Sequence, residues 1–106
     1  MNRQEAIELL QRALKISEQL AAVADGGDTS LVMSLDLQRR RLLQSARGAL
    51  QPLDEASRSI LREIAALNDR ALGLMEHRRR AKERDMDIAA VGRRAVAAYA
   101  NVRMQR

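Results

Sequence analysis

A helical repeat of apolar residues runs from Ala6 to Met75 and then stops. It stops at the segment 76–80, EHRRR, where cations fall on the helix face that had been apolar. Because an unpaired cation is costly to bury, the packed core must end near Met75. The pattern divides the chain into a core-forming part and a basic tail, and it favours contact with another protein over chemistry.

Capping and breaking residues predict where the helices lie. The first helix should span about 2–24, from the capping-box sequence NRQE to the glycine pair GG at 26–27. The second should span about 29–49 and the third about 54–90, with Asp54 as its N-cap. Gly92 is the expected break, which leaves a basic segment at 91–106. We therefore expect one all-α domain over 1–106, an antiparallel three-helix bundle with a long third helix and a short C-terminal fourth helical segment.

The charge of the chain is concentrated in its tail. The 106 residues carry a net charge of +5, of which residues 1–77 contribute −1 and residues 78–106 contribute +6. We interpret the tail first as a solvated helix end, and contact with nucleic acid or a membrane surface is the alternative. No apolar run is long enough to span a membrane, and the first residues open a helix rather than a signal peptide, so we expect a cytoplasmic protein.

Two polar residues interrupt the apolar faces when residues are placed at about 100° intervals around a helix. Arg39 shares the core face of the second helix, and Asn68 shares that of the third. We assign both a structural role. Arg39 is expected to reach a carboxylate on a neighbouring helix or to extend its charge to the rim of the core.

Apolar residues also exceed what a small bundle needs. The first helix has a second apolar stripe beside its core stripe, Met33 and Leu37 lie opposite the core face of the second helix, and Leu74 lies at the edge of the third. These residues predict a surface for a partner helix or a second copy of the chain. The alternative for the first helix is that two neighbours enclose it or that the C-terminal segment covers it. The predicted partner-binding residues are Met33, Leu37, Leu74, Leu9, Ile16 and Leu20.

The sequence offers little for catalysis or for binding a metal or cofactor. His77 is the only histidine, there is no cysteine, and the glycine pair at 26–27 lacks the frame of a phosphate loop. We therefore expect no enzyme activity and no cofactor. The arginine triplets at 39–41 and 78–80 each point in three directions, and Tyr99 is the only aromatic residue, so a nucleic-acid partner ranks below a protein partner.

The second helix, with the residues that lead into it, contains, in order, Gly27-Asp28, Leu35-Asp36, Arg39 and Leu42-Leu43. This order and spacing resemble the second helix of the FliT-type flagellar export chaperones, in which a Gly-Asp-Trp start leads into Leu-Glu-x-x-Arg-x-x-Leu-Leu. Thr29 stands here where that family usually has tryptophan, and Asp36 replaces the glutamate. The third helix is similar through the segment SILREI at 59–64 and Leu67-Asn68, and the segment GRRAVAAY at 92–99 resembles the family's C-terminal part.

This resemblance implies a cytosolic chaperone that binds the disordered C-terminal region of the flagellar filament-cap protein, prevents its early assembly and delivers it for export. Family members also contact the export ATPase complex, and some restrain a transcriptional activator. The family's last helix can cover the client groove, so Ile88, Ala95 and Tyr99 are the expected contacts of a self-masking C-terminal segment. Two alternatives remain: a homodimeric helical scaffold, and a nucleic-acid regulator acting through its basic tail. We expect a homodimer or a monomer–dimer equilibrium.

Overall fold

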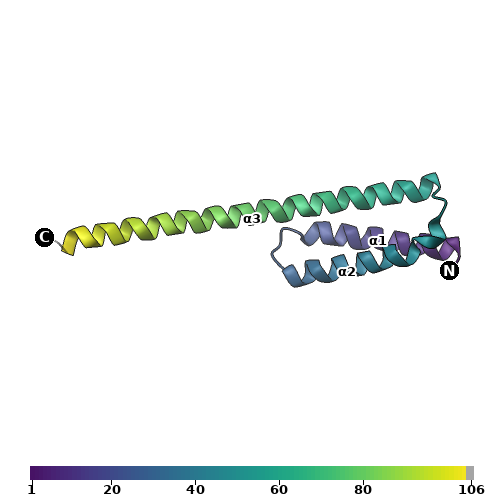
Figure 1. The fold of residues 1–106 in the computed structure, drawn as a ribbon, viewed down its shortest axis with the longest axis horizontal. Helices are drawn as coiled ribbons and strands as arrows, with labels where there is room; N and C mark the ends of the chain where they lie inside the picture. The colour runs from purple at the N-terminus through teal and green to yellow at the C-terminus, as the bar shows by residue number, and fades with distance from the viewer. Residues whose placement is uncertain (105–106) are drawn as a thin grey trace. The chain divides into compact units, whose positions relative to one another are not determined.

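The computed structural model describes residues 1–104, and its secondary structure in that range is entirely helical. Its elements are α1 (Arg3–Val23), α2 (Thr29–Ala46), the short 3-10 helix η1 (Gly48–Leu50) and α3 (Glu55–Met104) (Figure 1). The expected all-α class is confirmed. The chain divides into two units, Met1–Met75 and Glu76–Arg106, so the first part of α3 belongs to one unit and the rest to the other.

Side-chain caps begin all three α-helices. The Oδ1 atom of Asn2 accepts a hydrogen bond from the Glu5 backbone N–H at 2.8 Å, and Asp28 accepts one from Leu31 at 3.0 Å. Asp54 accepts one from the Ser57 backbone N–H at 2.8 Å. Each cap satisfies an amide that lacks a partner within its helix, which stabilises the helix by about 1 kcal/mol.

The turn between α1 and α2 depends on glycine. Gly27 has φ 86°, a left-handed conformation that side chains with a Cβ rarely adopt. The Gly26 N–H donates to the Val23 carbonyl at 3.0 Å and closes the end of α1. This reversal lays α2 antiparallel against α1 in the first unit (Figure 1).

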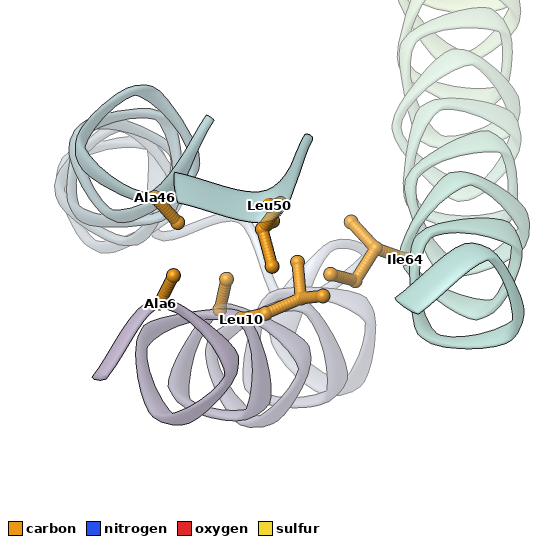
Figure 2. Packing of buried hydrophobic residues seen from close by; sticks show 6 residues of the cluster. Ala6, Leu10, Ala46, Leu50 and Ile64 are labelled. Atoms are coloured by element: carbon orange, nitrogen blue, oxygen red, sulfur yellow. The ribbon is translucent and has the colours of Figure 1, made fainter. Parts of the chain in front are cut away.

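The first unit is held by two clusters of buried apolar residues. The first joins α1, α2, η1 and α3, and Figure 2 shows its side chains directed into the space between these elements. Leu10 is fully buried there. The second joins the other ends of the same helices around Leu20, Leu35 and Ala71, and Met75 is the last residue packed against it. The buried members of the first cluster are Ala6, Leu10, Ala13, Ala46, Leu50 and Ile64.

Helix α1 contributes to both clusters, and the residues of its second apolar stripe pack within the first unit. Leu20 is only 3% exposed, so it lies in the core of the first unit rather than on an open stripe, and its role in partner binding stays a prediction. Leu9 is half-buried against the first cluster and Ile16 against the second. The wide apolar face of α1 is explained by its two neighbours within the first unit, α2 and the first part of α3.

One contact joins the start of α1 to the start of α3. The Arg3 guanidinium donates to the Pro52 carbonyl at 3.0 Å and lies 3.1 Å from the Asp54 carboxylate. The Ser57 backbone N–H, with help from the Arg3 cation, lowers the pKa of Asp54 from 3.8 to about 2. The residue that caps α3 therefore stays ionised in mildly acidic solution.

Two predicted boundaries were wrong. Helix α2 ends at Ala46 rather than near residue 49, because the chain tightens into η1 before Pro52. The third helix does not end near residue 90: α3 continues through Gly92 to Met104, so no separate fourth helix follows it in the described range. A single glycine costs only about 1 kcal/mol relative to alanine, which is too little to end a helix flanked by good helix formers. The last two residues of the predicted basic segment, 105 and 106, lie outside the described residues.

The second unit has few buried side chains. Between residues 76 and 102, only Glu76, Ala81 and Ala90 are half-buried, and the others are exposed. Its first turns carry ion pairs: Arg79 bonds Glu76 at 2.6 Å and Glu83 at 2.5 Å, and Arg80 lies 3.1 Å from Glu76. The Arg79 guanidinium lowers the pKa of Glu76. Within the part of the chain that the structure describes, no helix is long and apolar enough to cross a membrane.

Candidate protein-binding groove

A small open groove lies between α2 and the first part of α3, with Leu20 of α1 among its lining residues. Its volume is about 220 Å³. Pockets for drug-sized ligands measure roughly 300–1,000 Å³, so this groove has room for one or two side chains of a docked segment rather than for a whole small molecule. We call it the α2–α3 groove, and its lining residues are Leu20, Val32, Met33, Asp36, Arg39, Arg40, Asn68, Leu72 and Met75.

The polar part of the groove is an organised network around Arg39, which is only 7% exposed. One guanidinium nitrogen, Nη1, donates to Asn68 Oδ1 on α3 at 2.8 Å, and Nη2 donates to Asp36 on its own helix. The Asp36 carboxylate also accepts Arg40 Nε at 3.0 Å. A buried cation needs such partners to offset its lost hydration. Two arginines against one carboxylate leave the groove with a net positive charge.

The two polar residues that interrupt the apolar faces thus meet each other. The carboxylate that Arg39 bonds belongs to its own helix, so the first of the two expected arrangements, a carboxylate on a neighbouring helix, is not the one formed. Its partner on the neighbouring helix is the amide of Asn68. The position of both residues on facing apolar stripes was the sequence signal for this contact.

Exposed apolar side chains form the rim of the groove. Met33 is 67% exposed and Leu72 is 53% exposed, while Val32 and Met75, which also line the groove, are half-buried. Leu37 is 48% exposed one turn after Met33 but does not line the groove. Leu72 was not among the predicted partner-binding residues, because its spacing of four residues from Asn68 and three from Met75 is typical of the core face of the third helix.

The structure does not bring the six predicted partner-binding residues together. Met33 and the buried Leu20 line the α2–α3 groove. Ile16 lines a different hollow, formed with Arg12 and Leu42. Leu9 packs against the first cluster and Leu74 against the second, so both serve mainly as packing residues.

The residues expected to form a self-masking segment are all exposed. Ile88 is 70% exposed, Tyr99 is 68% exposed, and Ala95 is exposed as well. Their masking role stays a prediction. Among residues 1–104, no group of three or more histidine, aspartate or glutamate side chains is placed to hold a metal ion.

Comparison of the chain with protein-family models, with curated proteins and with solved structures found no match. The likeness to flagellar export chaperones therefore rests on the sequence motifs alone.

Proposed function

We propose that this chain is a non-enzymatic binding protein whose α2–α3 groove takes up a segment of another protein. The observation that supports it best is the combination of an exposed apolar rim, Met33 and Leu72, with the positive network of Arg39 and Arg40. Large side chains left exposed beside a preformed polar network are typical of recognition surfaces. The expected occupant is an amphipathic segment with apolar side chains next to a carboxylate.

The dimensions and chemistry of the groove suit a peptide segment. A groove of about 220 Å³ accepts an apolar anchor side chain, and the flexible Met33 can adjust to its shape. An acidic residue of the segment would face Arg40, whose side chain is 73% exposed and already oriented by Asp36. Helices that dock in such grooves use anchors three or four residues apart.

The resemblance in the second helix suggests which protein segment the groove binds. We propose a cytosolic export chaperone of an antiparallel bundle type, whose client is the disordered C-terminal region of the flagellar filament-cap protein. Binding would hold the client unassembled until delivery to the export apparatus, with the export ATPase complex as a further partner. The groove is compatible with this role because it is formed by α2 and α3, the helices that carry most of the resemblance.

Calorimetric titration with the C-terminal segment of the filament-cap protein from the same organism tests the proposal. The double variant Met33→Ser/Leu72→Ser should weaken binding at least tenfold and leave the melting temperature nearly unchanged, because both side chains are exposed at the rim of the groove. Met86→Ser is the matched control, since Met86 is 61% exposed in the second unit. Equal affinity of both variants and the parent chain would exclude this groove as the binding site, and no binding by the parent chain would exclude this client.

A homodimeric scaffold is the second candidate function. The observation in its favour is the row of exposed apolar residues in the second unit, where Ile88, Val91 and Val102 are each more than half exposed. A dimer formed through these residues would use no residue that lines the α2–α3 groove, so the two functions are compatible.

A further inference from the structure

The second unit carries an exposed apolar stripe at coiled-coil spacing. From residue 88 to residue 102, apolar residues recur at alternating steps of three and four, which is the spacing of the seam between two paired helices. Ile88 is 70% exposed, Val91 is 61% and Val102 is 57%. We call these residues the C-terminal seam, and its members are Ile88, Val91, Ala95, Ala98 and Val102.

This part of α3 has little to stabilise it as a lone helix. The ion pairs that support the second unit lie between Glu76 and Glu83, and the sequence has no acidic residue after Asp87. Three valines, an isoleucine and Gly92 lower the helix propensity from 88 to 102. Isolated helices of this length are marginal in water, so a partner that covers the seam would stabilise the helix.

The charges beside the seam indicate which partner. Asp85 and Asp87 precede its first member, and Arg93 and Arg94 lie near its middle. When two copies of this helix run antiparallel with Ile88 opposite Val91, the Asp87 of each copy falls beside the Arg94 of the other. We propose that residues 77–102 bind a second copy of this chain in this antiparallel arrangement, joined by two such ion pairs.

With Ile88 opposite Val91, residues 77–102 of the two copies pair along their whole length. Ala98 falls opposite Ala81, and Val102 falls opposite His77 at the start of the unit. Ala95 falls opposite Arg84, whose long aliphatic stem covers the small side chain. Alanines along the seam let the two helix backbones approach closely. In a parallel pair with the same seam, Arg84 would instead meet Arg84 of the other copy and Asp87 would face Gly92.

A second copy fits the helix better than a lipid surface does. Helices that lie in a membrane interface have their apolar residues on one side and a strongly polar opposite side. Here Val96 and Met86, 70% and 61% exposed, lie off the seam on other sides of the helix, and Arg93 and Arg94 point about 100° apart.

The mass of the full chain, measured by sedimentation equilibrium over a range of concentrations, tests the proposal. The parent chain should be a dimer, and Ile88→Glu should be a monomer because it places a carboxylate against Val91 of the other copy, at the middle of the paired helices. Val96→Glu is the matched control, since Val96 has the same 70% exposure but lies off the seam, and it should remain dimeric. Circular dichroism would verify that both variants keep the helices of the first unit.

Charge reversal tests the orientation. Asp87→Arg alone and Arg94→Asp alone should each raise the dissociation constant about tenfold, because each brings like charges together across the pair. The double variant should return to within about threefold of the parent value. A monomeric parent chain, a dimer unaffected by Ile88→Glu, or a double variant as weak as the single ones would overturn the proposal. Binding of a monomeric parent chain to vesicles of anionic lipid, lost in Ile88→Glu, would overturn it in favour of a membrane surface.

Discussion

The two units of this chain are both helical, yet they differ in what their helices need. In the first unit, residues of α1, α2 and the start of α3 bury one another, and Leu10 and Ala71 are fully enclosed. Between residues 76 and 102 of the second unit, the large apolar residues are exposed, and Ile88 is 70% exposed. Since α3 contributes to both units, helix formation alone does not decide burial. The difference shows that an apolar helix face forms a core only where other helices of the chain pack against it.

The largest expected effect is the loss of a core side chain in the first unit. Leu10→Ala should lower the free energy of unfolding by about 2–5 kcal/mol, because Leu10 is fully buried and α1 packs against two neighbours. Val96→Ala in the second unit should change it by less than about 0.5 kcal/mol. Urea unfolding followed by circular dichroism measures both, and similar costs for the two variants would abolish the contrast between the units.

The next effect concerns the buried cation of the α2–α3 groove. Arg39→Met should cost about 1–3 kcal/mol, because Asn68 loses its partner and Asp36 keeps only Arg40. Arg41→Met is the matched control, since Arg41 is the exposed neighbour on the same helix. Equal melting temperatures for the two variants would show that the network around Arg39 contributes nothing to the stability of the first unit.

Replacing glycine by alanine should raise stability in the second unit and lower it in the first. Gly92→Ala should increase helix content and stabilise α3 locally by about 1 kcal/mol, because an added Cβ at Gly92 meets no atom within 4 Å. Gly27→Ala should destabilise the first unit by about 1 kcal/mol, because Gly27 has φ 86°. Far-ultraviolet circular dichroism with thermal melting measures both, and a loss of helix in Gly92→Ala would contradict the continuous α3.

The smallest effect is a loss of stability in acid at the start of α3. The pKa of Asp54 is lowered from 3.8 to about 2 in the folded chain, so the unfolded chain binds the proton more tightly. The contribution of Asp54 is therefore complete above about pH 4 and is lost as the pH falls from 3.8 towards 2. Asp54→Asn keeps an N-cap but cannot titrate, so its melting temperature should fall less steeply over this range. Parallel curves for parent and variant would contradict the shift.

The sequence predicted the starts of the helices well because caps act locally. Asn2, Asp28 and Asp54 each bond an amide three residues ahead, and such contacts depend only on neighbouring residues. The end of α3 could not be found in the same way, because Gly92 carries no obligatory stop signal and its effect depends on the flanking alanines. Helix α3 continues to Met104 because the small helix propensities of many residues add up, and no single residue signals it.

The candidate site was predicted less completely than the helices. Met33 and Leu37 were found because they lie opposite the core face of a single helix. The burial of Leu20 could not be predicted, because the number of neighbours around α1 is a property of the packing and not of the α1 sequence. Leu72 was missed for the converse reason: it has core spacing, but the packing around it leaves it 53% exposed.

The single tyrosine has a practical consequence for the optical behaviour of the protein. Tyr99 is the only aromatic residue in the chain, and it is 68% exposed in the second unit. Near-ultraviolet absorbance and intrinsic fluorescence therefore originate entirely from the C-terminal part of α3, while the packed helices of the first unit contribute no signal there. The chain thus contains a natural fluorophore next to the C-terminal seam, and its emission will respond to whatever covers that helix and will be silent about events confined to the core.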